Sequence, residues 1–88
     1  MINAQTTMMI RISVIEIINR GRDKFRCQVT GSREGQLNTL HFCVEDSIVY
    51  MDISRELSLG WSGIINCNIE VKLNCNGENP AMYIKSII

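Results

Sequence analysis

Apolar and polar side chains alternate most clearly in the last third of the chain, residues 63–88. An apolar side chain stands at every second position of residues 65–73, and residues 81–87 resume an extended pattern after a break. A period of two residues is that of a strand with one buried face. The break contains an Asn-Gly pair, which tolerates the positive φ angles of a tight turn, and Pro80, which lacks a donor for the strand ladder. The pattern therefore predicts a C-terminal β-hairpin.

Three further strands are expected before this hairpin, arranged as a meander. In the first of them the apolar phase slips by one residue near Val14 and Ile15. A β-bulge or a sharp bend produces such a slip, and a strand that serves both halves of a small barrel needs one; the alternative is a strand buried on both faces. The Gly, Asn and Asp residues between the strands favour turns. The predicted strands cover residues 8–18, 24–30 and 37–44, and the predicted loops cover residues 19–23 and 31–35.

In the segment that leads into the C-terminal hairpin, the spacing of the apolar residues changes at Ser54. Residues 48–53 are expected to be extended, because Val49, Met51 and Ile53 share one phase. From Ser54, which can cap a helix, to the stop at Gly60, the spacing predicts a short helical turn.

Five or six short strands with one brief helical turn indicate an all-β fold. The first choice is a small five-stranded OB-like barrel with one short helical turn, and the alternative is an SH3-like barrel or a small sandwich. We expect a flexible N-terminal tail at residues 1–7 and a single β-barrel domain at residues 8–88. A chain of 88 residues has room for one such domain.

Charge is balanced over the whole chain but uneven along it. The formal net charge is zero, with 9 Lys and Arg against 9 Asp and Glu. Residues 1–35 carry an excess of cations, and the remainder carries the matching excess of anions. A molecule of this kind can present one basic and one acidic face, although it lacks an overall positive field.

Targeting and cofactor signals are absent from the sequence. The first residues are polar, without a basic region followed by an apolar run, and no apolar stretch approaches the length of a membrane helix. We therefore expect a cytoplasmic protein that does not enter a membrane. The spacing of the four cysteines matches no zinc motif, so reduced thiols and no metal or cofactor are expected. These cysteines are Cys27 and Cys67, placed on the apolar phase as small core side chains, and Cys43 and Cys75.

Catalytic motifs are also absent. His41 is the only histidine, and the sequence contains no nucleophile elbow, zinc-protease motif or phosphate-binding Gly-Lys loop. We expect a protein that is not an enzyme, with His41 as a surface residue of a strand.

The most informative functional signal is a run of cations at alternating positions across the first turn: Arg20, Arg22, Lys24 and Arg26. In an extended chain such residues project to one side and form a stripe that attracts phosphate. Arg33 and Lys85 are further candidate contacts. The competing interpretation is that these cations solvate the outer face of a hairpin and protect it from aggregation.

Exposed aromatic side chains are the second requirement for binding a single strand, because every base offers a face for stacking. Phe25 and Phe42 fall in the apolar phase, which leaves Tyr50, Trp61 and Tyr83 as candidates. Alternatively, these three cover the ends of the barrel or a dimer contact.

In length and layout the chain resembles the gene V type single-stranded-DNA-binding proteins of filamentous phages. The resemblance rests on the arginine-bearing first hairpin, the meander that follows it, and Gly60-Trp61 leading into the last hairpin. It implies a five-stranded OB-type barrel, a symmetric homodimer and cooperative coating of single strands. Arg20, Arg22 and Lys24 would match the DNA-binding hairpin of the family, and Tyr50 would be a stacking residue.

The leading hypothesis is therefore a homodimeric barrel that binds single-stranded DNA or RNA with little sequence preference. The competing hypothesis is a protein-protein interaction module of a phage, plasmid or accessory bacterial system, with Ile64, Ile87 and Ile88 at the partner or self-association surface. A third hypothesis is binding of a small ligand or glycan in a barrel mouth near Trp61.

Overall fold

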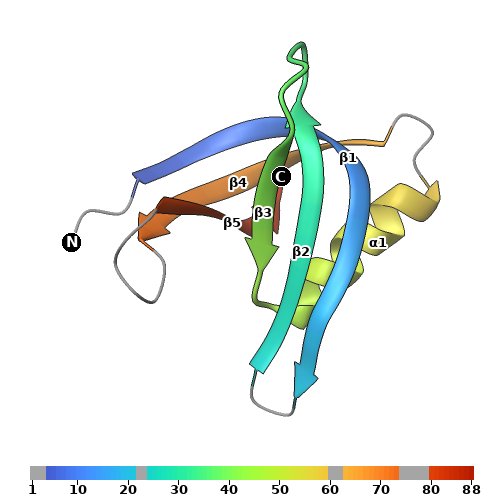
Figure 1. The fold of residues 1–88 in the computed structure, drawn as a ribbon. Helices are drawn as coiled ribbons and strands as arrows, with labels where there is room; N and C mark the ends of the chain where they lie inside the picture. The colour runs from blue at the N-terminus through green and yellow to red at the C-terminus, as the bar shows by residue number, and fades with distance from the viewer. Residues whose placement is uncertain (1–3, 22–23, 60–62, 74–79) are drawn as a thin grey trace.

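The computed structural model describes residues 4–21, 24–59, 63–73 and 80–88 (Figure 1). It contains five strands and one helix, in the chain order β1 (Ala4–Gly21), β2 (Lys24–Arg33), β3 (Leu40–Val44), α1 (Ser47–Leu59), β4 (Ile64–Leu73) and β5 (Pro80–Ile87). The strands form a closed barrel in the order β1-β2-β3-β5-β4, in which only the contact between β3 and β5 is parallel. The prediction of a small, mostly β barrel is confirmed.

Strand β1 is long because it pairs with two partners in succession. Its first part pairs with β4, from Ala4 opposite Val71 onward, and its later part pairs with β2 as far as the first hairpin. The β1–β2 register shifts between Ile12 and Val14, and the side chain of Val14 is 54% exposed. The predicted slip of the apolar phase is thus confirmed as a β-bulge within a shared strand.

The change of partner requires a close approach between β1 and β2 at Gly31. A Cβ atom on Gly31 would lie 2.4 Å from the carbonyl oxygen of Arg11, a distance that no side chain can occupy. Glycine therefore lets the two backbones meet where β1 bends. Residues 31–33 belong to β2 and not to a loop, since Arg33 pairs with Ile10. The predicted second loop begins too early because Gly31 permits close approach of two strands and is not a turn residue.

The N-terminal boundary also differs from the expectation. Residues 4–7 were expected to belong to a flexible tail, but they form the start of β1 and pair with β4. Their side chains are exposed, so the pairing depends on backbone hydrogen bonds and leaves no apolar pattern in the sequence. Strand β3 is shorter than predicted, beginning at Leu40, and Leu37 is fully exposed.

The C-terminal hairpin is confirmed, with β4 and β5 paired antiparallel from Cys67 opposite Ile87 to Leu73 opposite Pro80. The predicted turn at residues 74–79 lies outside the described residues. The core of the barrel takes side chains from every strand and from the helix. Its most deeply buried members are Ile10, Cys27, Val29, Phe42, Val44, Ile53, Cys67 and Ile69.

Residues 48–53, predicted to be extended, are helical. Val49 and Ile53 are buried, whereas Met51 between them is 65% exposed. Val49, Ile53 and the half-buried Leu57 recur at every fourth position, which is the spacing of one helix face. The prediction was wrong because Val49 and Ile53 fit a period of two as well as they fit a helix.

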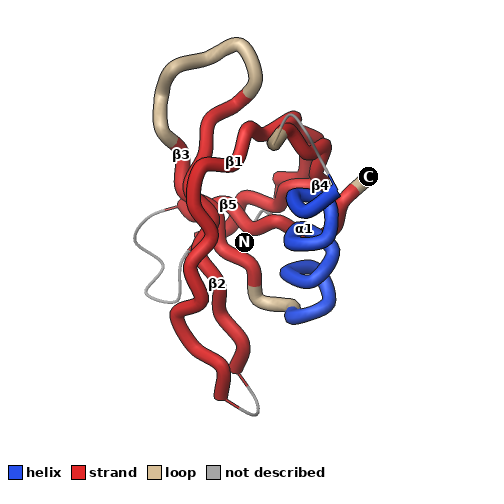
Figure 2. Tube along the Cα trace, turned by 90° about the vertical axis from the view of Figure 1, so that its right-hand side faces the viewer, coloured by secondary structure: helices blue, strands red, loops and turns tan. Residues whose placement is uncertain are grey.

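Helix α1 begins earlier than the predicted turn because Asp46 caps it. The backbone N–H of Ile48 donates to Asp46 Oδ1 at 2.8 Å, and the N–H of Tyr50 donates to the Asp46 carbonyl at 3.1 Å. Ser54, the predicted cap, lies in the interior of the helix. Figures 1 and 2 show the helix lying across one end of the barrel, where it packs on β5, β2 and β3. No helix in the described part of the chain is long and apolar enough to cross a membrane.

The capping interaction makes a prediction about stability. Asp46→Ala should lower the free energy of unfolding by about 1 kcal/mol, because it removes an acceptor from the first turn of α1. Ser54→Ala is the matched control and should change stability by less than about 0.5 kcal/mol, because alanine is favourable inside a helix. Urea denaturation followed by circular dichroism measures both values. A larger loss for Ser54→Ala than for Asp46→Ala would contradict this assignment of the helix start.

Candidate functional site

The outer surface of β2 and β3 carries a continuous row of polar side chains. On β2 the side chains of Phe25, Cys27 and Val29 turn toward the core, so the intervening residues turn outward. On β3 the core residues are Phe42 and Val44. We call the resulting surface the β2–β3 outer face; it consists of Lys24, Arg26, Gln28 and Thr30 on β2 and His41 and Cys43 on β3.

His41 lies at the centre of a small hydrogen-bonding group on this face. Its Nδ1 atom is 3.3 Å from Gln28 Nε2 and 3.5 Å from Thr30 Oγ1. Because an amide nitrogen can only donate, His41 Nδ1 accepts the bond from Gln28 in the neutral tautomer that carries its proton on Nε2. His41 is exposed, as predicted for a surface residue of a strand. The group offers donors and acceptors to a ligand that lies across the strands.

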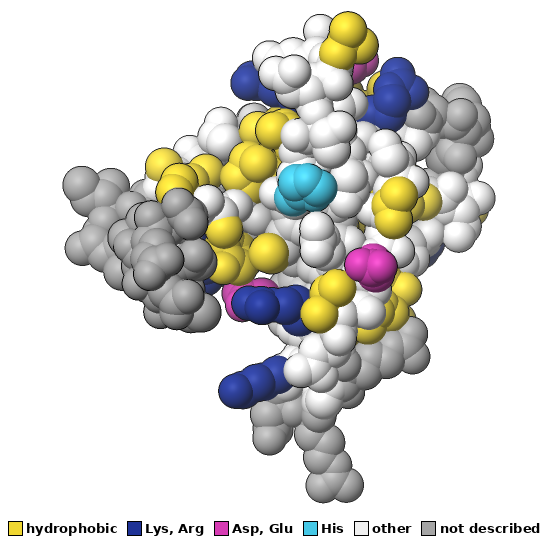
Figure 3. All heavy atoms as spheres, in the orientation of Figure 1, with side chains coloured by type: hydrophobic (Ala, Val, Ile, Leu, Met, Phe, Trp, Pro, Cys, Tyr) yellow, Lys and Arg dark blue, Asp and Glu magenta, His cyan; other side chains and the backbone are white. Residues whose placement is uncertain are grey.

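The basic end of the face lies beside the first hairpin. Lys24 and Arg26 are both exposed, and they line a hollow of about 540 Å³ together with Ile18, Asn19, Phe25 and Glu45. Figure 3 shows dark blue Lys and Arg side chains at the lower end of this face, below the histidine near its middle. Neither Lys24 nor Arg26 has an ion-pair partner among the residues that the structure describes.

Tyr50 is not an exposed stacking residue. It lies on α1, is half-buried, and packs against Phe25 with the ring centroids 5.5 Å apart and the planes inclined by 50°. This contact attaches the helix to the inner side of β2, directly beneath Lys24 and Arg26. Tyr50 therefore packs on the inner side of the strand segment that carries Lys24 and Arg26, and it adds no exposed ring to the basic end of the face.

Tyr83 is covered as well, although the alternation along β5 correctly predicts that its side chain is on the outer side of the strand. Its neighbours Met82 and Ile84 pack in the core, so Tyr83 lies on the outer side of β5. Its side chain is nevertheless only 6% exposed, because the ammonium group of Lys72 lies 4.3 Å from the centroid of the ring. The expectation that Tyr83 is exposed is wrong.

Lys72 also holds two carboxylates beside this tyrosine. Its Nζ atom is 3.6 Å from Glu45 Oε1 and 3.8 Å from Glu70 Oε1. The negative charge of Glu45, which lines the same hollow as Arg26, is thereby partly balanced. A phosphate at the basic end would meet less repulsion from Glu45 than the sequence suggests.

The structure brings together only part of the predicted site. Lys24 and Arg26 lie side by side, but Arg33 lies at the opposite end of β2, about 23 Å from Arg26 and about 30 Å from Lys24 along an extended strand. Lys85 is exposed on β5, two residues beyond Tyr83. Arg20 pairs with Phe25 in the β1–β2 register, and its side chain is not described. Arg22 and Trp61 lie outside the described residues, so the hypothesis of a ligand site near Trp61 stays a prediction.

Four residues of the face were not among the predicted contacts: Gln28, Thr30, His41 and Cys43. Their outward direction follows from the same alternation that places Cys27 and Val29 in the core. Their convergence does not, because it depends on the β2–β3 register, in which Thr30 is opposite His41.

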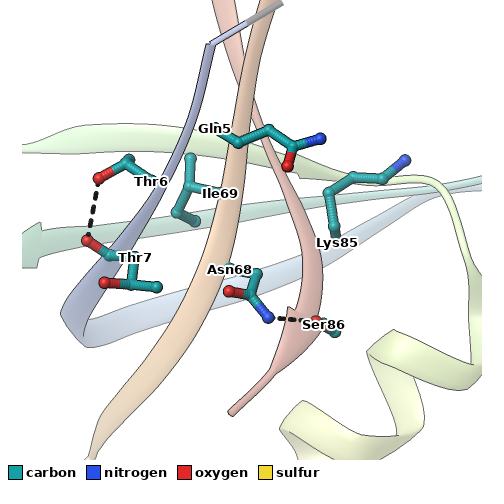
Figure 4. A pocket seen from close by; sticks show the side chains of 7 residues that line it. All are labelled: Gln5, Thr6, Thr7, Asn68, Ile69, Lys85 and Ser86. Carbon is teal, nitrogen blue, oxygen red and sulfur yellow. Dashed lines mark hydrogen bonds between the residues drawn. The ribbon is translucent and has the colours of Figure 1, made fainter.

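A second hollow, of about 480 Å³, lies on β1, β4 and β5 (Figure 4). The side chains around it are mainly amides and hydroxyls with one ammonium group, and Asn68 Nδ2 donates to Ser86 Oγ at 2.8 Å. The described residues of this lining include no aromatic ring and one cation, so they suit a neutral polar group better than a phosphate chain. The lining residues are Gln5, Thr6, Thr7, Asn68, Ile69, Lys85 and Ser86.

The described cysteines are all free thiols. Burial raises the pKa of Cys67 to about 11, and burial also raises the pKa of Cys27. Both therefore stay protonated and unreactive near neutral pH, as expected for small core side chains. Cys43 lies on the β2–β3 outer face and is half-buried. Among the described residues no group of His, Cys, Asp or Glu side chains gathers in a way that could hold a metal ion.

Comparisons with models of protein families, with curated proteins and with solved structures found no match to this chain.

The environments of the thiols predict their order of reaction. In a Cys75→Ser background at pH 8, Cys43 should react with a thiol reagent much faster than Cys27 or Cys67, because only Cys43 reaches the surface and the other two are held as neutral thiols. Mass spectrometry of the labelled peptides identifies the site. In denaturant all three should react at similar rates. Fast labelling of Cys27 or Cys67 in the folded protein would contradict the placement of these strands.

Proposed function

We propose that this barrel is OB-like and that it binds single-stranded nucleic acid along the β2–β3 outer face. The observation that carries the proposal is the position of the exposed Lys24 and Arg26 on that face, next to the hydrogen-bonding group around His41. OB-type barrels have five strands in a Greek-key arrangement and bind oligonucleotides over strands 2 and 3 and the adjoining loops. The strand order, and the helix between β3 and β4, support this choice over an SH3-like barrel or a sandwich.

Local charge supports phosphate binding at the basic end even though the whole chain is neutral. Lys24 and Arg26 project into solvent, and the nearest acid of their hollow, Glu45, interacts with Lys72. Electrostatic attraction acts over roughly a Debye length, about 8–10 Å at moderate salt, so the local balance matters more than the net charge. A phosphate chain entering beside the first hairpin therefore meets cations first.

The mode of recognition differs from the one implied by exposed aromatic residues. Tyr50 and Tyr83 are covered by Phe25 and Lys72, so stacking on them does not contribute. Binding instead combines phosphate contacts from Lys24 and Arg26 with hydrogen bonds from the group around His41. Such contacts are largely independent of base sequence. With two phosphates neutralised, the logarithm of the affinity should fall with the logarithm of salt concentration with a slope of about −1.4.

A pair of charge reversals on one strand tests the proposal. Arg26→Glu should weaken binding of a fluorescent oligothymidylate about tenfold at low salt, because it replaces a phosphate contact by a repulsive charge. Arg33→Glu makes the same change in net charge at the far end of β2 and should weaken binding less than about threefold, an effect of long-range charge only. Fluorescence anisotropy measures both affinities, and circular dichroism checks that both variants are folded.

Two results would contradict the proposal. If the unmodified protein shows no saturable change in anisotropy at low salt, it does not bind single strands. If Arg33→Glu weakens binding as much as Arg26→Glu does, the contact surface is not the basic end of the β2–β3 outer face.

A further inference from the structure

The hollow on β1, β4 and β5 contains a row of polar side chains that crosses all three strands. Asn68 on β4 turns outward, because its neighbours Cys67 and Ile69 are buried in the core. In the strand registers Asn68 is opposite Thr7 of β1 and Ser86 of β5. The three side chains therefore lie side by side in this hollow of about 480 Å³.

A β-bulge in β5 adds an ammonium group to the row. The β4–β5 register shifts next to Asn68, where β5 has one residue more than β4. Ile84 is buried and Ile87 packs against the core, so both residues between them, Lys85 and Ser86, line the hollow. Bulges of this kind redirect side chains and are common next to binding sites.

Most of the polar groups in the hollow are available to a ligand. Asn68 Nδ2 donates to Ser86 Oγ, which leaves Asn68 Oδ1 as an acceptor and the Ser86 hydroxyl as a donor. The side chains of Gln5, Thr7 and Lys85 form no hydrogen bond or ion pair with any residue that the structure describes. Figure 4 shows Gln5 extending from β1 toward Lys85, with the Asn68–Ser86 bond at another side of the hollow.

This mixture of donors and acceptors matches hydroxyl groups. A hydroxyl both donates and accepts, as do the amides and hydroxyls that line the hollow. A carboxylate or a phosphate only accepts, so it has no proton to offer to the carbonyl oxygens of Asn68 and Gln5. The volume falls within the range of small-ligand pockets, roughly 300–1,000 Å³. A compact ligand with several hydroxyl groups therefore suits the hollow best.

We propose that this hollow is a binding site for a mono- or disaccharide, whose hydroxyl groups bond to the row formed by Thr7, Asn68 and Ser86. Gln5 and Lys85 supply further hydrogen bonds at its edge. Each such bond replaces one to water, and the described lining has no aromatic ring for a sugar to stack on. The dissociation constant should therefore be on the order of 1 mM.

The saccharide site is separate from the β2–β3 outer face. Strand β4, at the centre of the hollow, pairs with β1 and β5 and with neither β2 nor β3. The proposal therefore goes beyond nucleic-acid binding and does not depend on it.

Titrations followed by nuclear magnetic resonance test the proposal on the unmodified protein. Glucose, maltose and lactose are added separately, each up to tens of millimolar. At least one of them should cause saturable shifts of the side-chain amide signals of Gln5 and Asn68 and of the backbone amide signal of Ser86. Signals of Lys24 and Arg26 should stay unchanged. Sodium acetate is the probe for an anion and should bind more weakly than that sugar.

Three substitutions locate the site and test its preference for a neutral ligand. Asn68→Ala should weaken sugar binding about fivefold, because it removes a donor and an acceptor from the centre of the row. Asn66→Ala, at an exposed position of β4 outside the hollow, is the matched control and should change the affinity less than about twofold. Lys85→Gln keeps an N–H donor without the charge and should retain the affinity within about threefold. The dispersion of the amide signals checks that each variant is folded.

Four results would overturn the proposal. The first two are that no sugar causes a saturable shift at Asn68, and that Asn66→Ala weakens binding as much as Asn68→Ala does. The others are that acetate binds more tightly than the sugars, and that Lys85→Gln abolishes binding, because either result would make the hollow an anion site. None of these results affects single-strand binding, which is measured separately with oligothymidylate.

Discussion

The barrel depends on the close approach of two backbones at Gly31. Strand β1 must leave β4 and continue along β2 within a few residues, and it does so where Arg11 and Ile10 face Ser32 and Arg33. The Arg11 carbonyl occupies the space that a side chain at Gly31 would need. Because β1 pairs with both β2 and β4, the sheet closes with β3 beside β5, and the strands surround the hydrophobic core. Closure also positions β2 and β3 as one continuous outer face.

Much of the fold could be predicted from local patterns, because a strand with one buried face has an apolar side chain at every second residue. Cys27 and Val29 in β2, and Ile65 and Ile69 in β4, follow that rule. The helix could not be predicted in the same way. Val49 and Ile53 are compatible with both periods, and the deciding fact is the exposure of Met51, which depends on how α1 packs at the end of the barrel.

The candidate site was predictable only in part for a related reason. The alternation in β2 correctly places Lys24 and Arg26 outward, but the separation of Arg33 from them depends on β2 continuing through Gly31. The covering of Tyr83 depends on Lys72, which comes from the neighbouring strand, and local periodicity carries no information about such a contact. The outcome is a face of cationic and polar side chains, whereas Tyr50 and Tyr83, which were predicted to join it, pack against Phe25 and Lys72.

The central claim is that a single strand lies along the β2–β3 outer face, and mapping by nuclear magnetic resonance tests it most directly. An oligothymidylate titrated at low salt into the isotope-labelled protein should shift the backbone amide signals of Lys24, Arg26 and Gln28 and the ring signals of His41. Signals of Asn68 and Ser86, in the hollow on β1, β4 and β5, should stay unchanged. Shifts confined to Asn68 and Ser86, or no shifts at all, would contradict the account.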